Sequence, residues 1–463
     1  MTSPRRSARF LTLALGLLLW SCGNPAPRTR AIAVVGGTLI DGTGRAPVAN
    51  ALIIIEEGRF REVGSRDQVA VPEGAEIIDA GGSTVLPGLI DGHCHYEAWA
   101  DDLYLAFGVT TCPDISGNAP EPLAVRREAI ASGAIRGPRL WFTGLTVDGP
   151  VPDGASESRR ARSGIVVQTP EEARRAVQSL VDQGVDGLKF YDYLAPDVAR
   201  AAAEEAHRLG RPVFSHSLDV SAAAEAGYDS VEHFWAVVYS SIQDPKRKAE
   251  LDLARNSGQI STGEFHVYFD PRMNDTTVRL LVENNIHWSP AWATWFRPYS
   301  RRAAMMKAQE LALITDSRFG IPPDHRDVVE SLYATYENAA PERQAELLQA
   351  YRNLEAFARQ FVDAGGKIHA GSDPNRIAPA YALHVELDLL VAAGLTPVQA
   401  IQAASLNVAE AWRKDADFGS VEPGKIADLV IVRGDLNNDI SLTQNPENIE
   451  AVYQNGRRVA GSR

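Results

Sequence analysis

Short apolar segments alternate with alanine-rich helical segments through the middle of this 463-residue chain. The predicted helices and the strands that follow them are residues 170–183 and 187–191, 196–209 and 212–216, and 221–226 and 230–233. Strands that alternate with helices lie parallel, because each helix carries the chain back to the start of the next strand. Over about 330 residues, this alternation predicts an α/β fold, a (β/α)8 TIM-like barrel with insertions.

The barrel is expected to span residues 87–414, with an insertion around residues 240–360. The insertion has an irregular pattern, contains a seventh strand near Ile286–Pro290, and has helices that could cover the barrel mouth. The two chain ends differ from the barrel, because they are rich in short strands separated by glycine turns. Residues 31–86 and 415–463 are therefore expected to form one small β-sandwich domain together, with a hairpin turn at Asn455–Gly456.

The first 22 residues have the pattern of an export signal. Arginines at the start precede an apolar stretch, Phe10–Trp20, that is too short to span a bilayer. Ser21–Cys22 after this stretch resembles a bacterial lipobox, which implies lipid attachment at Cys22; an ordinary secretory signal is the alternative. We expect a signal peptide at residues 1–22 and an exported protein, membrane-anchored through Cys22 and facing the periplasm or the cell surface.

The charge of the chain argues against a nucleic-acid partner. Removal of residues 1–21 deletes three arginines and no acidic residue, which changes the formal net charge from −13 to −16. Proteins that bind nucleic acids usually carry basic surfaces. We therefore expect a small-molecule substrate, no nucleic acid, and no membrane contact besides the lipid anchor, while a homo-oligomer stays open.

Two cysteines remain besides Cys22, namely Cys94 and Cys112. Cys94 alternates with two histidines, so its side chain is expected to point away from them. Export would permit a disulfide between the two cysteines. We favour two buried free thiols.

Polar residues end several of the predicted barrel strands, where barrel enzymes carry their catalytic groups. The first is the pair His93 and His95, which share one face of a strand because the side-chain period is two. Each residue alone has a structural alternative, such as a hydrogen-bonded core histidine or a helix cap. Their apolar neighbours predict burial, and buried charges need partners. Together they are the donors of a site for two divalent metal ions, most simply zinc: His93, His95, Lys189, His216, His233 and Asp373.

The sequence around these residues resembles the amidohydrolase superfamily, and in particular its imidazolonepropionase-like and metal-dependent prolidase-like branch. The resemblance covers nearly the whole mature chain and rests on five motifs in order: Gly36–Gly44, Leu86–His95, Phe107–Thr111, His384–Pro397 and Gly419–Val430.

The resemblance implies a role for each strand-end residue. His93, His95 and Asp373 would bind one metal ion, and His216 and His233 would bind the other. Lys189 would carry a carboxylate formed with carbon dioxide and bridge both ions. Hydroxide bridging the ions would attack the substrate, while Asp373 acts as acid and base.

Further candidates surround this site. Tyr191 shares the inward face with Lys189 and could stabilise an oxyanion, or pack in the core. His384 could line the pocket or lie on the surface, whereas His369 is expected to be structural. An aromatic pocket, or ordinary core packing, could be formed by Trp235, Trp288, Trp292, Trp295 and Phe296. We favour solvent exposure over substrate binding for Arg297, Arg301 and Arg302.

One region departs from the relatives that the sequence resembles. Many prolidase-like members carry a Gly-Gly-His loop after the third strand, but residues 144–154 contain no histidine. The leading hypothesis is an exported binuclear amidohydrolase that cleaves an amide bond of a dipeptide or an N-acyl amino acid. The alternatives are a cyclic-amide hydrolase like imidazolonepropionase, an ester or lactone hydrolase, and a metal-binding lipoprotein without catalysis.

Overall fold

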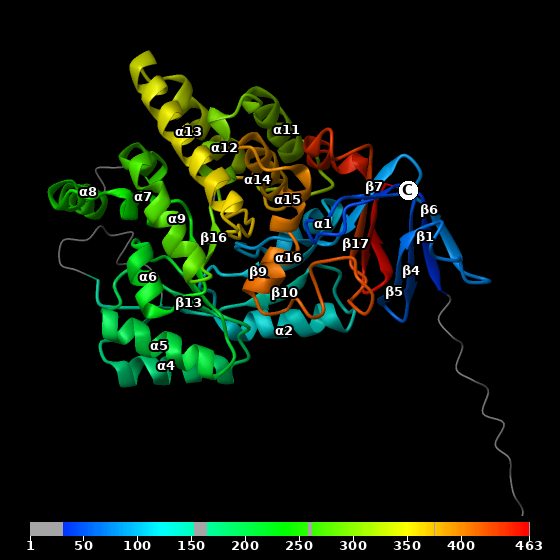
Figure 1. The fold of residues 1–463 in the computed structure, drawn as a ribbon, viewed down its shortest axis with the longest axis horizontal. Helices are drawn as coiled ribbons and strands as arrows, with labels where there is room; N and C mark the ends of the chain where they lie inside the picture. The colour runs from blue at the N-terminus through cyan, green and yellow to red at the C-terminus, as the bar shows by residue number, and fades with distance from the viewer. Residues whose placement is uncertain (1–30, 152–163, 258–261, 375, 463) are drawn as a thin grey trace, which may run out of the picture.

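The computed structural model describes residues 31–151, 164–257, 262–374 and 376–462 (Figure 1). The predicted signal peptide and lipid-attachment site at residues 1–22 lie outside the described residues. Within the described ranges, every helix is too short or too polar to cross a membrane.

The centre of the molecule consists of short parallel strands. In chain order they are β8 (Leu89–Ile90), β9 (Val109–Asp114), β10 (Arg139–Phe142), β11 (Thr146–Asp148), β12 (Gly164–Val166), β13 (Leu188–Phe190), β14 (Val213–Ser215), β15 (Ser230–Glu232) and β16 (His287–Ser289). They form two sheets, with the strand orders β10-β9-β8 and β12-β11-β13-β14-β15-β16. The parallel pairing of β13, β14, β15 and β16 confirms the pattern predicted from the alternation of strands and helices.

Main-chain hydrogen bonds connect these two sheets. Between β10 and β13, the Asp186 N–H donates to the carbonyl of Phe142 at 2.8 Å. Beyond β16, Trp288 pairs in parallel with Ile368, and the Gly92 N–H donates to the carbonyl of Ala370 at 2.8 Å. Residues 367–370 therefore connect β16 back to the chain that follows β8.

Helices surround the parallel strands and bury apolar side chains against them. Their bounds are α1 (Asp101–Ala106), α2 (Pro120–Ala131), α4 (Pro170–Asp182), α5 (Pro196–Arg208), α6 (Val220–Ala226), α7 (Trp235–Ser241), α8 (Pro245–Ser257), α9 (Asn274–Glu283), α10 (Ala293–Phe296), α11 (Ala303–Thr315), α12 (His325–Glu337), α13 (Pro341–Asp363), α14 (Tyr381–Ala392), α15 (Pro397–Ala403) and α16 (Leu406–Ala411). The three helices predicted before β13, β14 and β15 are confirmed to within one residue at each end. The first of them, α4, begins where the Thr169 side chain accepts the Glu172 N–H and Pro170 occupies the first helical position.

The two ends of the chain lie together at one side of the molecule, where Figure 1 shows β1, β4, β5 and β6 beside β17. The strands are β1 (Ile32–Val35), β2 (Thr38–Leu39), β3 (Val48–Ala49), β4 (Ala51–Glu56), β5 (Arg59–Ser65), β6 (Glu76–Asp79), β7 (Ser83–Pro87), β17 (Leu429–Arg433), β18 (Ile449–Gln454) and β19 (Arg457–Ala460). They form the sheets β5-β4-β1-β6 and β19-β18-β17-β7-β2-β3, so the second sheet combines both ends. One apolar cluster, which includes Val34, Ile53, Val85 and Leu429, joins the two sheets.

The apolar run before His93 is divided between the two parts of the molecule. β7 pairs with β17, whereas β8 pairs with β9. Gly88 makes this division possible, because a Cβ atom there would lie 2.2 Å from the Thr110 hydroxyl oxygen. The chain can change sheets here only with a residue that lacks a side chain.

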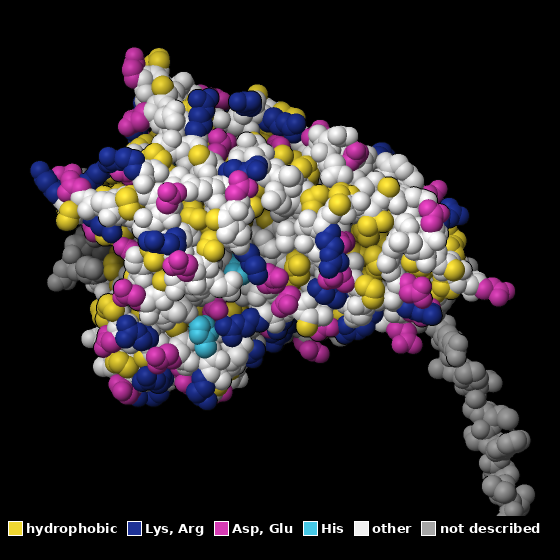
Figure 2. Space-filling view, in the orientation of Figure 1, with side chains coloured by type: hydrophobic (Ala, Val, Ile, Leu, Met, Phe, Trp, Pro, Cys, Tyr) yellow, Lys and Arg dark blue, Asp and Glu magenta, His cyan; other side chains and the backbone are white. Residues whose placement is uncertain are grey.

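The surface carries charges of both signs. Figure 2 shows Lys and Arg side chains interspersed with Asp and Glu side chains on this face. Several of them form exposed ion pairs, such as Arg359 with Asp363 at 2.8 Å. Exposed pairs of this kind contribute little to stability, because water and salt screen them.

Candidate metal centre

The predicted metal ligands follow the carboxyl ends of the parallel strands. His93 and His95 come after β8, and His216 and His233 directly follow β14 and β15. Lys189 lies within β13, and Asp373 follows the segment that pairs with β16. Because the strands are parallel, their carboxyl ends share one side of the fold, so these side chains can converge.

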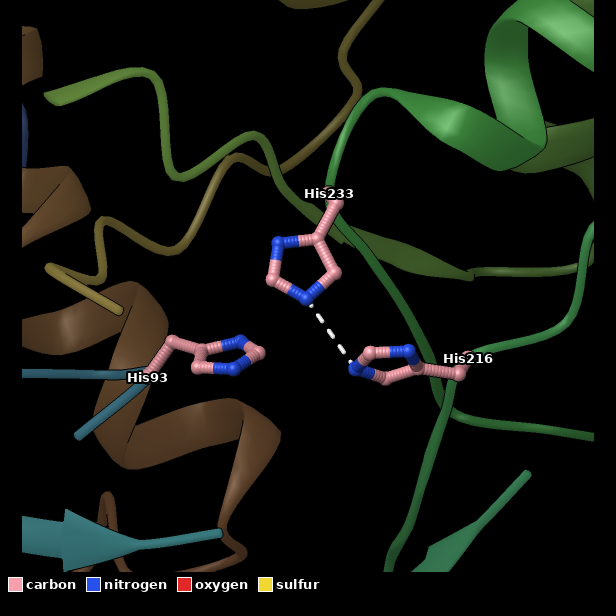
Figure 3. A group of neighbouring side chains, drawn as sticks. All are labelled: His93, His216 and His233. Carbon is pink, nitrogen blue, oxygen red and sulfur yellow. Dashed lines mark hydrogen bonds between the residues drawn. The ribbon is translucent and has the colours of Figure 1, made fainter. Parts of the chain in front are cut away.

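Three of the histidines form one compact group. Ligand atoms of His93, His216 and His233 all lie within 4.8 Å of one another, and all three residues are buried. Figure 3 shows the three rings converging from separate segments of the chain. The Nε2 atoms of His216 and His233 are 3.0 Å apart. Three imidazoles at this spacing form a set of nitrogen donors for a divalent cation.

A second group shares His93 with the first. Ligand atoms of His93, His95 and Asp373 also lie within 4.8 Å of one another. The His95 Nε2 atom is 3.4 Å from Asp373 Oδ1, and His233 Nδ1 is 3.7 Å from Asp373 Oδ2. The rings of His93 and His95 are stacked at 5.7 Å, as predicted for residues two apart on an extended chain. Asp373 thus lies between the two groups.

Lys189 is buried next to both groups, with a relative exposure of 1%. Burial lowers the pKa of His93, and the charge of Lys189 lowers it further. Burial alone would raise the pKa of Asp373, but the nearby histidines, first His233, and Lys189 together lower it below its ordinary value. Lys189 is therefore close enough to act electrostatically on His93 and on Asp373.

A carboxylate that the sequence reasoning missed orients His93. Glu232 is fully buried, and its Oε2 atom is 2.6 Å from His93 Nδ1. Its Oε1 atom accepts a hydrogen bond from the Ser230 hydroxyl at 2.7 Å, and His369 Nε2 lies 3.6 Å away. Burial raises the pKa of Glu232, but the charge of His369 and hydrogen bonds from His369 and His93 hold the pKa well below its ordinary value. An ionised Glu232 keeps the proton of His93 on Nδ1 and leaves Nε2 available as a ligand.

Two of the candidate ligands lie at unusual backbone conformations. His233 has φ of 64° and Asp373 has φ of 39°. Hydrogen bonds hold both peptides in place: the His233 N–H donates to the Ser289 carbonyl at 2.6 Å, and the Asp373 N–H donates to the His93 carbonyl at 2.8 Å. The Thr294 hydroxyl donates to the Asp373 carbonyl at 2.5 Å. Strained residues of this kind occur preferentially at functional sites, where surrounding contacts offset their cost.

Tyr191 and His384, the other predicted catalytic residues, lie in different surroundings. The Tyr191 ring stacks on the ring of His216, with centroids 4.3 Å apart, so it adjoins the metal centre. His384 is fully buried in α14, and its Nε2 atom is 2.8 Å from the carbonyl oxygen of Phe107. Its described contacts are with Phe107, and none of them joins it to the four converging histidines. His369, predicted to be structural, is buried against the Ser230 hydroxyl at 2.8 Å.

The candidate aromatic residues differ in their surroundings. Trp288, Trp292 and Phe296 are fully buried in the core and contact one another. Trp235 instead lies on the metal centre, with its ring 4.2 Å from that of His233.

The prediction that Arg297 is exposed to solvent is wrong. Its side chain is fully buried, with Nε 3.2 Å from Glu310 Oε2, because helices of the insertion pack around it. Arg301 and Arg302 are exposed, as predicted.

The prediction of two free thiols is also wrong. The structure joins Cys94 and Cys112 by a disulfide bond. Cys94 forms a parallel bridge with Asp114 of the neighbouring strand β9, which also carries Cys112. The sequence pattern does not give the register between β9 and the chain after β8, so it could not pair the two cysteines.

The residues present fit a metal ion. His93 Nε2 and His233 Nδ1 are buried and have no hydrogen-bond partner among the described residues. Buried nitrogens in proteins are usually satisfied, so these two point to a bound group. Imidazole nitrogens and a carboxylate are the ligands that zinc and similar divalent cations prefer.

The chain is similar in sequence to known proteins. The model of the amidohydrolase family matches residues 84–459. An adenine deaminase of Rubrobacter xylanophilus is 25% identical over 439 residues, which cover 92% of this chain and 57% of that protein. This chain thus spans little more than half the length of that relative. An imidazolonepropionase of a Geobacillus species is 24% identical over 443 residues, which cover 90% of this chain and 91% of that protein.

Solved structures share the fold. A Xaa-Pro dipeptidase with methionine bound in its active site superposes with a TM-score of 0.64 and 21% identity. The superposition covers 92% of this chain and 99% of the dipeptidase. The α/β fold is therefore that of known amidohydrolase structures, and this chain belongs to the amidohydrolase family of hydrolases.

Proposed function

We propose that this protein hydrolyses the amide bond of a dipeptide or an N-acyl amino acid with the help of two divalent metal ions, preferably zinc. The observation that carries the proposal is the pair of donor groups that share His93, with Asp373 of one group 3.7 Å from His233 of the other. Two overlapping sets of ligands with a carboxylate between them match the requirements of a two-metal hydrolytic site.

Each ion would be bound by a different set of residues of this chain. His93, His95 and Asp373 would hold one ion, and His216 and His233 would hold the second. Lys189 would bridge the two as a carboxylate, formed when its neutral amine nitrogen bonds to the carbon of carbon dioxide and loses a proton. Burial of Lys189 supports this step, because a low-dielectric surrounding disfavours the charged ammonium form. The bound ions supply a water of lowered pKa and polarise the substrate carbonyl.

Asp373 and Tyr191 supply the remaining chemistry. The pKa of Asp373 lies below its ordinary value, so its side chain is an ionised carboxylate at neutral pH. In this form it would accept a proton from the attacking water and then deliver it to the leaving nitrogen. Tyr191 stacks on His216 and would donate its hydroxyl hydrogen bond to the developing oxyanion.

The strand arrangement supports this site. We propose that β8, β9, β10, β13, β14, β15, β16 and residues 367–370 close into a (β/α)8 barrel, and that the two end sheets form a β-sandwich. Active sites of such barrels lie at the carboxyl ends of the strands, where the candidate ligands are found.

A cyclic amide is the second candidate substrate. The similarity to an imidazolonepropionase over 90% of this chain favours it. Both reactions break a carbon–nitrogen bond at a carbonyl group, so the same residues would serve either one.

Export to an oxidising compartment is also part of the proposal. The disulfide between Cys94 and Cys112 supports it, because such bonds form and persist in exported proteins. Lipid attachment at Cys22 would then hold the enzyme at a membrane.

The central experiment is a substrate screen of the zinc-loaded protein with pools of dipeptides, N-acyl amino acids and cyclic amides. Asp373→Asn should retain bound metal but lose about 100-fold or more of the turnover. The matched control is Asp102→Asn, since the Asp102 side chain is 66% exposed. Turnover near the wild-type rate in Asp373→Asn would exclude this residue from the mechanism. If metal-loaded wild type hydrolyses none of the substrate pools, the proposed function is refuted.

A further inference from the structure

Two side chains that contact each other lie on the segments that follow the last two parallel strands, close in sequence or in contacts to Asp373. Trp295 belongs to α10, which comes shortly after β16, and Arg376 lies three residues beyond Asp373. The Thr294 hydroxyl fixes α10 against this loop, since it donates to the carbonyls of Ser372 and Asp373. Arg297, also next to α10, donates to the Arg376 carbonyl at 2.5 Å. These bonds hold Trp295 and Arg376 in one unit beside the metal centre.

The guanidinium group of Arg376 lies over the Trp295 ring, with Cζ 4.6 Å from the ring centroid. Arg376 is exposed, and its side chain makes no ion pair with any residue that the structure describes. Its neighbours differ, because Arg297 pairs with Glu310 and Arg302 pairs with Asp388. The pKa of Arg376 is lowered, because the protein covers part of its side chain and because Arg297 carries the same charge, while the charge of Asp373 partly offsets both effects. An exposed cation that lies on an aromatic face near the candidate metal centre, and that makes no ion pair with a described residue, is suited to bind an anion.

The indole group of Trp295 adds a second donor. Its Nε1 atom is buried and has no hydrogen-bond partner among the described residues. Trp235, which lies on the ring of His233, also has a buried indole nitrogen without a described partner. An indole N–H can only donate a hydrogen bond, so each of these groups requires an acceptor. Buried donors are paired in most native structures, which points to acceptor atoms on a ligand.

We propose that Arg376 and the Trp295 indole bind a carboxylate of the substrate on the amine side of the scissile bond. This inference rests on the proposed function and narrows it to substrates with a free carboxylate, such as dipeptides and N-acyl amino acids. A guanidinium group matches the geometry of a carboxylate. Because Arg376 is already stacked on Trp295, its side chain loses less conformational entropy when it binds a ligand. Neutral amides of the same compounds would lack the charge that Arg376 recognises.

Matched substrate pairs test the inference. We would measure kcat and KM for N-acetyl-leucine against N-acetyl-leucinamide, and for alanyl-leucine against alanyl-leucinamide. Wild type should prefer the free acid by about 10- to 100-fold in kcat/KM, the range that hydrogen bonds to a charged group supply. Arg376→Gln should remove most of this preference through a higher KM for the acid and leave kcat/KM for the amide within about threefold. Trp295→Phe keeps an aromatic ring but removes the N–H donor. Its kcat/KM should fall about fivefold for the acid and stay unchanged for the amide.

Conservative and control variants separate recognition from structure. Arg376→Lys should retain part of the preference, because it keeps the charge but loses the planar pair of donors. Arg301→Gln removes an exposed arginine of the insertion, and kcat/KM should stay unchanged for both the acids and the amides. Circular dichroism spectra and bound metal should be unchanged in each variant.

The possible failures are distinguishable. If wild type hydrolyses acid and amide equally well, the proposed function stands and the carboxylate subsite is refuted. If neither pair is hydrolysed, calorimetric titration of N-acetyl-leucine and N-acetyl-leucinamide into the zinc-loaded protein tests the subsite without turnover. A carboxylate preference in binding that Arg376→Gln abolishes would support the subsite, and equal binding of the two compounds, or a preference that survives in Arg376→Gln, would refute it.

Discussion

Substitution of Glu232 tests directly whether this carboxylate orients His93 in the candidate metal centre, because each of its two oxygens contacts a neighbouring side chain. One oxygen lies 2.6 Å from His93 Nδ1, and the other accepts from the Ser230 hydroxyl at 2.7 Å. In Glu232→Gln, one oxygen becomes an NH2 group. The amide oxygen can still face His93, because the Ser230 hydroxyl can accept a bond from the new NH2 group. The tautomer of His93 would then be kept, and only the negative charge would be lost.

Glu232→Ala removes both contacts and leaves His93 free to place its proton on Nε2, the atom that a metal ion needs. Loss of such an outer carboxylate typically weakens metal binding by about 10- to 100-fold. We therefore expect Glu232→Gln to weaken metal binding by an amount near the lower end of this range, and Glu232→Ala by an amount near the upper end. In free energy, the range corresponds to about 1.4–2.7 kcal/mol.

Competition between the protein and a chromogenic chelator for zinc measures this affinity. The control is Glu410→Gln, since Glu410 is a partly exposed carboxylate paired with Lys367. Thermal unfolding and circular dichroism would establish that each variant is folded. Zinc affinity within about threefold of wild type in folded Glu232→Ala would refute the role assigned to Glu232.

Three further predictions concern stability and location. The double variant Cys94→Ser/Cys112→Ser should lower the free energy of unfolding by about 3 kcal/mol in denaturant titrations, because the disulfide closes a loop between cysteines 18 residues apart and restricts the unfolded chain. An unfolding midpoint equal to that of wild type, with or without reductant, would argue against the bond. Burial raises the pKa of Glu386 to about 8, so the folded state binds its proton more tightly than the unfolded state. Stability should therefore fall as the pH rises from about 4.5 to 8. Glu386→Gln should melt at a higher temperature than wild type at pH 8.5 and at a similar one at pH 5, whereas parallel pH profiles would contradict the assignment. Cys22→Ser should release the protein from membranes, and unchanged fractionation would exclude the lipid anchor.

The repeating parts of the fold were the most predictable from sequence. Helices such as α4 and α5 begin with a proline at the first position and carry a regular apolar face, so local residues determine them. The parallel strands alternate with these helices at short distances along the chain. The four histidines, Lys189 and Asp373 could be placed together because the ends of parallel strands meet on one side.

Contacts between distant segments were less predictable. The pairing of Cys94 with Cys112 depends on the register between two strands, which apolar patterns do not specify. The burial of Arg297 depends on Glu310, a residue of α11 that its own neighbourhood in the sequence does not indicate. The sequence does not mark Arg376, because a single arginine in a loop belongs to no pattern, and its position over Trp295 depends on contacts between distant segments.

Glu232 shows most clearly where the alternation rule stops being valid. In a regular strand, neighbouring residues point to opposite faces, so a metal ligand at His233 implies that Glu232 points away from the centre. The structure brings both to the centre, because His233 leaves the strand with φ of 64° and turns its ring back toward His93. Asp373, with φ of 39°, likewise leaves the extended conformation beyond residues 367–370. Strained residues at the carboxyl ends of strands thus let one strand supply both a candidate ligand, His233, and the carboxylate that contacts another candidate ligand, His93. In related barrels, the residue just before a strand-end histidine should therefore be examined as a supporting carboxylate, although its strand position alone argues against it.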